Sequence, residues 1–325
     1  MIEIFPHDKA IYNFEKDMWN ETHFSNDERI PKITIEFYDL LLGEGPGKEE
    51  PIDTQQCSGV LIGKDLIASV YHPILYSYHE GTSIPCRIHF DFLTIGRYTI
   101  SFNYLQEYKC RAQILKEVYG VTNDREFGEK HPPEIPIQPF PNFVEKDPRY
   151  GSSLGPFNQK HPTIEKIRNY DFVRHDCLGD FIIYRLPEKI ENVSPFRLLS
   201  FISNDPIDIK CYGYPVVPDI NDFSLLRSYQ RFHPTKDKHG IYNEMLDIFG
   251  ENEQRIAYGQ AIPQKCLSFT NASTEKGMSG GPIIYEEDVI GINCGAWEFE
   301  NRNYFFPIAH PFTEKYLFHC GYFRK

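Results

Sequence analysis

The chain has 325 residues, enough to bury a large core in one or two domains. Its formal net charge is −12, and no stripe of Lys and Arg offsets it. This balance argues against nucleic acid or an anionic membrane as the main partner. No stretch approaches the roughly 20 apolar residues that a membrane span needs, and no signal-type segment opens the sequence. We therefore expect no membrane span and slightly favour the cytoplasm, with the compartment left open.

Proline and glycine are scattered along the whole chain, with 24 and 22 residues, and 15% of the residues are aromatic. This composition favours many short strands joined by turns, so we expect a globular, mostly β protein. The eight cysteines are spread widely, and their redox state stays open. The sequence has no paired Cys-x-x-Cys and no His-Glu-x-x-His spacing, so we expect neither a metal nor a cofactor.

The first predicted strands follow a polar, acidic N-terminal extension, residues 1–30. Apolar and polar residues alternate from Lys32, which predicts the start of a sheet. Two apolar runs around a Gly-Lys-Asp turn predict a hairpin over 57–70. Further strands are predicted at 86–92, 98–102 and 110–115. Residues 121–168 are rich in proline and poor in apolar runs, which indicates a surface insertion.

An apolar strand that opens at Asp180 closes the first half of the chain, and a link at 188–199 leads into a second set of strands. These strands are predicted at 207–212, 256–262, 266–270, 282–285, 289–294 and 304–309, with a loop around 227–240. A short C-terminal helix is predicted from Thr313, a residue type that caps helices. The predicted domains are therefore the extension 1–30, a first half 31–187 that carries the insertion, and a second half 188–325.

The strongest chemical signal is the segment 277–282, which reads Gly-Met-Ser-Gly-Gly-Pro between a polar loop and an apolar strand. Attack of a serine on a carbonyl needs hydrogen-bond donors aimed at the developing oxyanion. The small residues let the backbone N–H groups of Gly277 and Ser279 reach that point. The alternative is a tight Gly-Ser turn with no catalytic role.

This segment resembles the nucleophile motif of the trypsin/chymotrypsin-like serine proteases. The histidine of that family follows a Cys-Gly-Gly-x-Leu-Ile type hairpin, and here Cys57-Ser-Gly-Val-Leu-Ile precedes Ile67-Ala-Ser-Val-Tyr-His72. The family's aspartate opens an apolar strand, as Asp180-Phe-Ile-Ile-Tyr-Arg-Leu does here. A Gly-Tyr-Pro bend after Cys211 is similar to the branch that includes bacterial and stress-response proteases. The resemblance covers roughly residues 32–312.

The resemblance implies an all-β fold of two antiparallel β-barrels of the chymotrypsin type, with the Pro-rich insertion and the C-terminal helix added. It implies Ser279 as nucleophile, His72 as general base and Asp180 as the carboxylate that orients the histidine. The N–H groups of Gly277 and Ser279 would form the oxyanion hole. The order of these residues along the chain agrees with the family.

The identity of the carboxylate has alternatives, and the residue before the nucleophile departs from the family pattern. Asp171 and Asp176 lie close to Asp180, and any of these could be a turn residue or a cap. Asp180 is preferred because only it directly opens the apolar strand. Trypsin-like zymogens have an aspartate just before the nucleophile, which pairs with a new amino terminus after cleavage. Met278 stands there in this chain, so we expect a pocket that is preformed or ordered by another trigger.

By the register of the motif, two segments should wall the substrate pocket, Ser273–Lys276 on one side and Asn293–Ala296 on the other. The predicted substrate-binding residues are Ser273, Thr274, Asn293, Cys294, Gly295 and Ala296. Ser273 stands where trypsin-like enzymes keep an aspartate, so a preference for Lys or Arg is not supported. We expect a neutral pocket lined by polar groups.

The sequence therefore predicts a serine endopeptidase that acts on protein or peptide substrates through an acyl-enzyme, with the oligomeric state open. The alternative is a catalytically silent relative that binds a partner through the same cleft. An esterase of the α/β class is less consistent with the sequence. Those enzymes carry Gly-x-Ser-x-Gly between a strand and a helix, and their catalytic residues follow in the order Ser, Asp, His. In this chain the serine comes last, and predicted strands lie on both sides of it.

Overall fold

The computed structural model describes most of the chain on either side of one long central segment. The described residues are 10–13, 16, 18–38, 50–75, 86–121, 179–217, 220, 235–265, 268–296 and 303–322. The predicted insertion at 121–168 lies outside them, apart from its first residue. Among the described residues, no helix is both long enough and apolar enough to cross a membrane.

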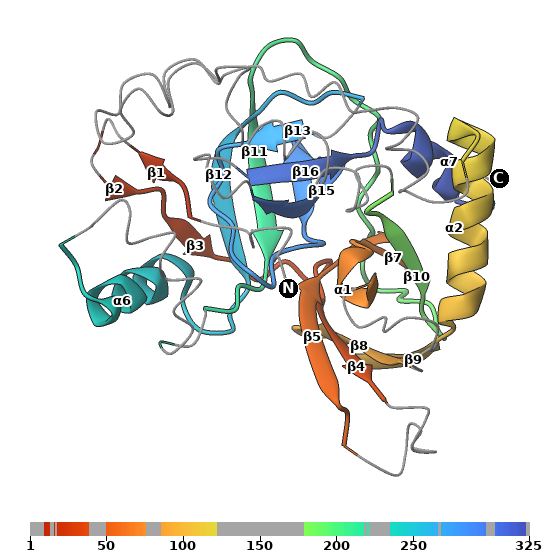
Figure 1. Ribbon diagram of the computed structural model, residues 1–325, viewed down its shortest axis with the longest axis horizontal. Coiled ribbons are helices and arrows are strands. Elements are labelled where there is room, and N and C mark those ends of the chain that lie inside the picture. Colours follow the sequence, from red (N-terminus) through yellow and green to blue (C-terminus); the bar gives the residue numbers. More distant parts are fainter. Residues whose placement is uncertain are drawn as a thin grey trace.

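The second half of the chain forms a closed antiparallel barrel of six strands (Figure 1). The strands are β11 (Ile207–Gly213), β12 (Arg255–Ala261), β13 (Ser268–Thr270), β14 (Pro282–Tyr285), β15 (Asp288–Ala296) and β16 (Asn303–Pro307). They pair in the order β11-β14-β15-β16-β13-β12, and β12 pairs again with β11, which closes the ring. Ile283, Ile290 and Phe305 are fully buried in it. Closure of the ring leaves few unpaired strand edges.

The described part of the first half contains two antiparallel sheets. The sheet β5-β4-β8-β9 is made of β4 (Lys32–Phe37), β5 (Asp53–Ser58), β8 (Cys86–Phe92) and β9 (Gly96–Phe102). The sheet β10-β7-β6 is made of β6 (Val60–Gly63), β7 (Leu66–Ser69) and β10 (Ile182–Arg185). Every second residue of β4 is buried, as the alternation from Lys32 predicts. The predicted all-β fold class is confirmed.

One buried apolar core joins the two halves. It contains Ile33 and Ile67 from the first half together with Val289 and Ile292 from the second. The link between the halves is hydrogen-bonded to both, because the Phe196 N–H donates to Leu61 (2.9 Å) and the Leu199 N–H donates to Val289 (2.9 Å). The halves therefore pack as one body, while the exact boundary near 188 stays a prediction.

A helix, α2 (Tyr104–Tyr119), lies where a strand was predicted at 110–115, so that prediction is wrong. The Asn103 side chain caps α2 by accepting the Gln106 N–H, and Gly120 ends it in the left-handed conformation. A six-residue window fits a helix face as well as a strand, and these caps lie outside it. A second helix, α6 (Lys238–Phe249), begins inside the predicted loop at 227–240.

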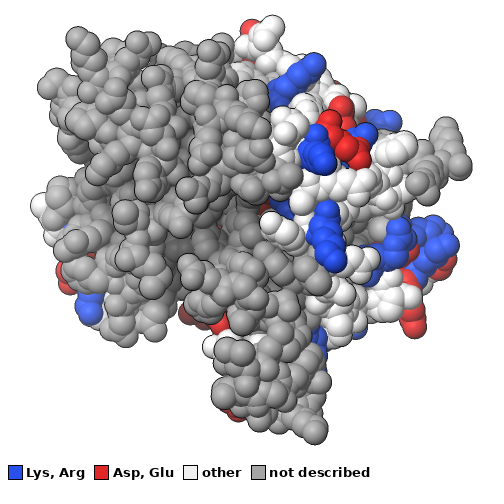
Figure 2. Space-filling view, turned by 45° about the vertical axis from the view of Figure 1, so that its right-hand side comes forward, with Lys and Arg blue, Asp and Glu red and all other residues white. Residues whose placement is uncertain are grey.

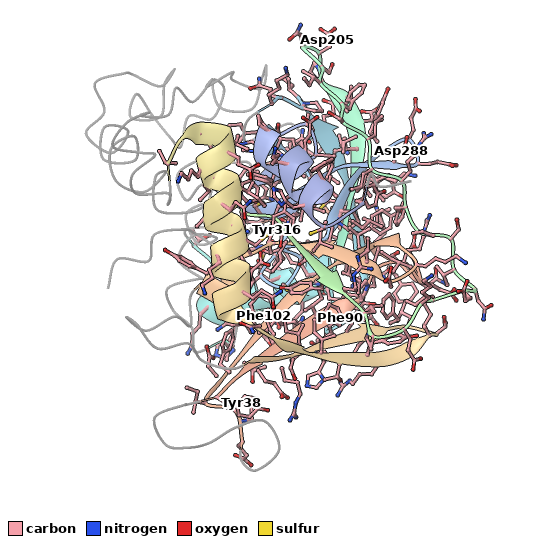
Figure 3. The ribbon with its side chains drawn as sticks, turned by 90° about the vertical axis from the view of Figure 1, so that its right-hand side faces the viewer. Tyr38, Phe90, Phe102, Asp205, Asp288 and Tyr316 are labelled. Carbon is pink, nitrogen blue, oxygen red and sulfur yellow. The ribbon has the colours of Figure 1, made fainter. Side chains whose placement is uncertain are left out.

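The predicted C-terminal helix exists as α7 (Pro311–His319), but it begins earlier than predicted. Its N-cap is His310, whose ring accepts the Phe312 N–H, while Thr313 lies buried within the helix. α7 packs along α2, and the Tyr316 hydroxyl donates to Glu107 across that contact (2.5 Å; Figures 1 and 3). Burial raises the pKa of Glu107 above its usual range, although nearby Arg111 opposes the shift.

The described part of the N-terminal extension contains three short strands that the sequence did not predict. They are β1 (Tyr12–Asn13), β2 (Met18–Trp19) and β3 (Thr22–Phe24). β3 pairs with β12, so the extension joins the sheet of the second half although it precedes the first half in sequence. Figure 1 shows these strands beside α6, on the side of the second barrel away from α2 and α7.

Candidate active site

His72 and Asp180 are bonded to each other at the edge of the first half. His72 opens the short helix α1 (His72–Leu75), just after β7, and Asp180 lies just before β10, which pairs with β7. His72 Nδ1 lies 2.9 Å from Asp180 Oδ2. Asp180 Oδ1 accepts the backbone N–H groups of Tyr71 (2.8 Å) and His72 (2.9 Å). The carboxylate therefore fixes the backbone of His72 as well as its ring.

The pKa of Asp180 lies below its usual range despite deep burial. Burial alone would raise this pKa, but the positive charge of His72 and the hydrogen bonds from the His72 ring and from the two backbone N–H groups lower it further than burial raises it. The carboxylate is thus ionised at neutral pH. The competing carboxylates Asp171 and Asp176 lie outside the described residues.

Arg111 of α2 holds the backbone on both sides of Asp180. Its guanidinium donates to the carbonyl of Gly179 and to that of Phe181 (2.9 Å). The same group lies over the ring of Tyr71, with Cζ 3.6 Å from the ring centroid. Arg111 is only 5% exposed. This contact could not be predicted from the sequence, because the residue lies in the segment that was predicted as a strand.

Ser279 lies in a tight loop between β13 and β14 in the second half. The residue is 9% exposed, and its Oγ donates to the Cys294 carbonyl of β15 (3.3 Å). Its own carbonyl accepts the Ser58 N–H of the first half (2.7 Å). The loop is further held by two bonds to Asn293, whose carbonyl accepts the Gly280 N–H (2.8 Å) and whose N–H donates to Gly281 (2.9 Å).

Gly280 brings the Ser279 loop against the strand that leads to His72. A Cβ atom at Gly280 would lie 2.1 Å from the Ser58 carbonyl oxygen and 2.3 Å from Ser69 Oγ. Its φ of 88° is also one that only glycine adopts easily. Ser69 ends β7, three residues before His72, and pairs in register with Ile182, just beyond Asp180. The three predicted catalytic residues thus come from segments that meet at one place.

The geometry of Gly277 matches that of the third residue of a type II turn. The Met278 N–H donates to the Glu275 carbonyl (2.9 Å), and the φ of Gly277 is 91°. A Cβ atom at this glycine would lie 2.4 Å from the Tyr214 carbonyl oxygen. Within the described part of the chain, the Gly277 N–H has no hydrogen-bond acceptor, so it is available to a ligand.

Ser58 joins the two halves and was not singled out in the sequence. Its N–H donates to Ser279, its Oγ donates to the Gly277 carbonyl (2.7 Å), and that Oγ accepts the Tyr214 N–H (2.8 Å). Its carbonyl accepts the Ser69 hydroxyl (2.7 Å). The sequence held a signal for this role, because Ser58 stands in the Cys-Ser-Gly segment where the resembling family has glycine.

The predicted pocket residues lie on two segments beside Ser279. Ser273 and Thr274 are fully buried on the loop before the motif, and Asn293 and Cys294 are buried on β15. β15 has a bulge there, between Asn293 and Gly295, and its last residue Ala296 pairs with Asn303. The Ser273 hydroxyl accepts the Ile11 N–H (2.9 Å) and donates to the Asn20 carbonyl (2.8 Å). No motif in the sequence indicates this involvement of the N-terminal extension.

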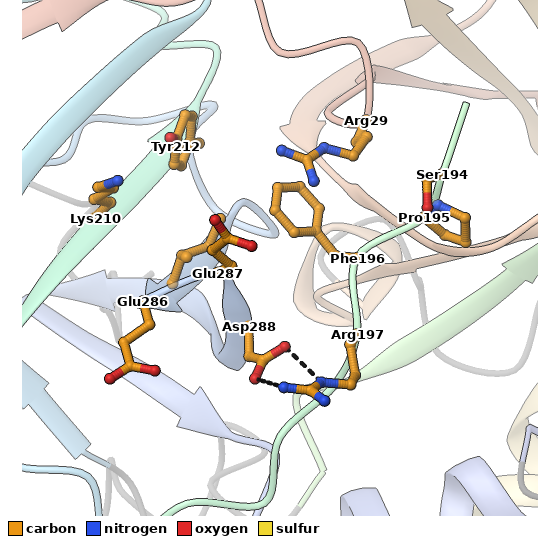
Figure 4. A pocket seen from close by; sticks show the side chains of 11 residues that line it. Arg29, Ser194, Pro195, Phe196, Arg197, Lys210, Tyr212, Glu286, Glu287 and Asp288 are labelled. Carbon is orange, nitrogen blue, oxygen red and sulfur yellow. Dashed lines mark hydrogen bonds and ion pairs between the residues drawn. The ribbon is translucent and has the colours of Figure 1, made fainter. Parts of the chain in front are cut away.

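A separate cavity of about 600 Å³ lies away from these residues (Figure 4). The residues that line it are Arg29, Ser194, Pro195, Phe196, Arg197, Lys210, Tyr212, Ile284, Glu286, Glu287 and Asp288. Its charged groups are of both signs, and Arg197 already pairs with Asp288 (2.5 Å). None of the candidate catalytic residues lines this cavity, so we do not place the active site there.

The described surface also mixes both signs of charge. Figure 2 shows Lys and Arg side chains next to Asp and Glu side chains over the described part of one face. Some of the exposed cations are paired, as with Arg97 and Asp91 (2.5 Å) and Arg185 and Asp65 (2.5 Å). Among the described residues, no group of three or more His, Cys, Asp or Glu side chains could hold a metal ion.

No protein-family model matches the sequence, and no curated protein matches it either. Solved structures do match. A Glu endopeptidase in complex with MPD is 13% identical, with 93% of this chain and 96% of that chain covered and a TM-score of 0.45.

Two structures of the Rv3671c protease also match, each at 11% identity. The inactive form has a TM-score of 0.40, with 89% of this chain and 88% of that chain covered. The active form, from M. tuberculosis, has a TM-score of 0.39, with coverages of 86% and 76%. These neighbours are serine proteases of the trypsin/chymotrypsin fold, at low identity. The function of this chain is therefore inferred from its own site.

Proposed function

We propose that this chain is a serine endopeptidase that hydrolyses peptide bonds in proteins or peptides through Ser279, His72 and Asp180. One observation carries the proposal above all others. An ionised, buried Asp180 bonds to the ring and the backbone of His72, and the Ser279 loop packs against the strand that leads to this histidine. Such a pairing of base and carboxylate beside a serine in a tight loop is the arrangement that activates a serine nucleophile.

In the acylation step, Ser279 Oγ attacks the scissile carbonyl carbon as His72 Nε2 takes the hydroxyl proton. Asp180 keeps the proton of the neutral ring on Nδ1 and stabilises the imidazolium that forms. The carbonyl oxygen becomes an oxyanion, which accepts the N–H groups of Gly277 and Ser279. When the C–N bond breaks, His72 gives its proton to the leaving amine, and the acyl group stays on Ser279.

In the deacylation step, water attacks the acyl carbon as His72 takes one proton from the water. The second tetrahedral intermediate collapses, and its C–O bond to Ser279 breaks as His72 returns the proton to Ser279 Oγ. The products are a carboxylic acid and the regenerated enzyme. The atoms and the charges balance without a cofactor.

The substrate pocket is proposed to accept a neutral side chain. The predicted substrate-binding residues, among them Ser273, Thr274 and Asn293, carry no charge. The Ser273 hydroxyl is already bonded within the chain. The Thr274 hydroxyl is buried and has no hydrogen-bond partner among the described residues, so a bound substrate group would relieve the cost of that burial.

The proposal is tested by comparing hydrolysis of a mixed peptide library by the wild type, Ser279→Ala, His72→Ala and the double variant. Because the residues act as a unit, each single substitution should lower turnover by on the order of a millionfold, and the double variant should lose little more. Circular dichroism checks that each variant is folded. Equal hydrolysis by the wild type and Ser279→Ala would show that this serine is structural, and would favour a silent binding protein.

A further inference from the structure

The described residues of the N-terminal extension are bonded to the loop that precedes the nucleophile. The Ile11 N–H donates to Ser273 Oγ (2.9 Å), and the same hydroxyl donates to the Asn20 carbonyl (2.8 Å). The Asn20 N–H in turn donates to the Ile11 carbonyl (2.7 Å). Ser273 is fully buried, so water cannot replace these partners at low cost.

A second set of polar contacts holds the start of the same loop. The Asn20 side chain donates to the Asn271 carbonyl (3.4 Å), and Asn271 Oδ1 accepts the Gln260 N–H of β12 (2.6 Å). β3 pairs with β12 as well, with Thr22 opposite Ala257. The extension is therefore paired with β12, the strand to which Asn271 bonds the start of this loop.

A buried apolar cluster includes residues of the extension and residues from both ends of the loop. Ala10 and Trp19 belong to the same buried cluster as Ala272 and Met278. Ala272 directly precedes Ser273 of the predicted pocket wall, and Met278 directly precedes the nucleophile. Trp19 is 4% exposed and Met278 is fully buried. Removing the extension would expose this apolar surface and leave the buried Ser273 hydroxyl without its partners.

These contacts bear on the loop whose backbone must stay in place for catalysis. Between Ala272 and Met278 the chain contains no regular strand, and Gly277 holds a left-handed φ. A loop of this kind keeps one conformation only when its surroundings fix it. The described surroundings include Ser58 on one side and the N-terminal extension on the other.

We propose that Ala10, Ile11, Trp19 and Asn20, here named the N-terminal clamp, order the substrate pocket and the oxyanion loop. The clamp does this by bonding Ser273 and by contributing Ala10 and Trp19 to the buried apolar cluster that contains Met278. The chain would thus reach its reactive geometry by folding, with Met278 buried in an apolar cluster that the extension shares, and with no need for a new amino terminus. This inference rests on the proposed function, since it assigns the ordering of that same site.

The test compares Trp19→Ala with Met18→Ala in the full-length protein. Met18 is the neighbour of Trp19 on β2 and is 42% exposed, so its substitution is a matched control. The first measurement is hydrogen–deuterium exchange, read by mass spectrometry over 271–281. We expect exchange there to be at least tenfold faster in Trp19→Ala than in wild type, with β4 and β8 unchanged. Met18→Ala should match wild type throughout.

The second measurement is the rate of labelling by a fluorophosphonate, at a temperature where each variant is folded by circular dichroism. Trp19→Ala and Ser273→Ala should react about tenfold or more slowly per folded molecule, and Trp19→Phe should recover most of the rate. If wild type is not labelled while the exchange result holds, the proposed function fails and the ordering stands. Equal exchange over 271–281 in Trp19→Ala and Met18→Ala would overturn the clamp, whatever the labelling rate.

Discussion

The Asp180 carboxylate accepts more hydrogen bonds than a pairing with His72 alone would need. Two come from backbone N–H groups, of Tyr71 and His72, and one joins the His72 ring. These donors keep the carboxylate ionised in spite of its burial. We conclude that Asp180 sets the position of His72 as well as the tautomer of its ring.

Asp180→Asn should therefore impair both catalysis and acid-dependent stability. Turnover should fall by about four orders of magnitude, because the amide favours the wrong tautomer of His72. The folded-state pKa of Asp180 lies below its unfolded value of about 3.9. The stability that the carboxylate contributes is then full above about pH 4 and is lost as the pH falls through the folded-state pKa.

Urea unfolding of the wild type and Asp180→Asn at several pH values between about 6 and 3 checks this prediction. The difference in unfolding free energy between the two should shrink as the pH falls below about 4. A difference that does not change over this range would show that the ionised carboxylate contributes no net stability.

The sequence offers candidate chemistry at three single residues. Ser279 was predicted from its glycine-rich neighbours, and His72 and Asp180 from their places at the ends of strands. Their catalytic roles stay a proposal, although the structure brings His72 and Asp180 into contact. Ser58 was missed because a serine in a hairpin has many possible partners, and only the packing of the two halves decides which groups it meets.

At the scale of elements, helix α2 supports the candidate site from outside the two sheets of the first half. Figure 3 shows α2 along one side of the molecule, with Tyr316 of α7 beside it. From α2, Arg111 bonds the carbonyls of Gly179 and Phe181. The carboxylate of Asp180 is therefore positioned partly by a helix that is distant from it in sequence.

Arg111→Lys should lower turnover by about tenfold or more, because a lysine keeps the charge but cannot reach two carbonyls with a planar fork. The substrate KM should change much less, since Arg111 acts on the carboxylate and touches no substrate. Arg97→Lys is the matched control, because Arg97 is 60% exposed and pairs only with Asp91 among the described residues. Steady-state kinetics of both variants measures the turnover and the KM. Equal turnover in Arg111→Lys and wild type would show that α2 does not position Asp180.

The elements differ in how well the sequence predicts them. Strands with clear alternation or apolar runs, such as β4 and β14, were predicted close to their observed bounds. A strand was predicted within α2 because a short window over its middle fits both periods, and the caps Asn103 and Gly120 lie outside that window. In the N-terminal extension, β3 forms by pairing with the distant strand β12, so no local sequence pattern predicts it.

At the scale of the whole molecule, the candidate site is assembled from both halves of the chain. His72 and Asp180 come from the first half and Ser279 from the second, and Ser58 bonds across the junction. A shared apolar core holds the halves in one body. Two strand-rich halves could be predicted from the sequence. The use of the N-terminal extension behind the pocket could not, because it depends on a contact between residues more than 250 positions apart.

The central claim is that Ser279 is a nucleophile activated by its surroundings, and the site of fluorophosphonate attachment tests this most directly. The folded protein is labelled at neutral pH, digested and read by tandem mass spectrometry, with urea-unfolded protein as the control. The account predicts one adduct on Ser279 in the folded protein, none in the unfolded protein, and none in His72→Ala over the same time. Labelling of another residue, or no labelling of the folded wild type, would contradict it.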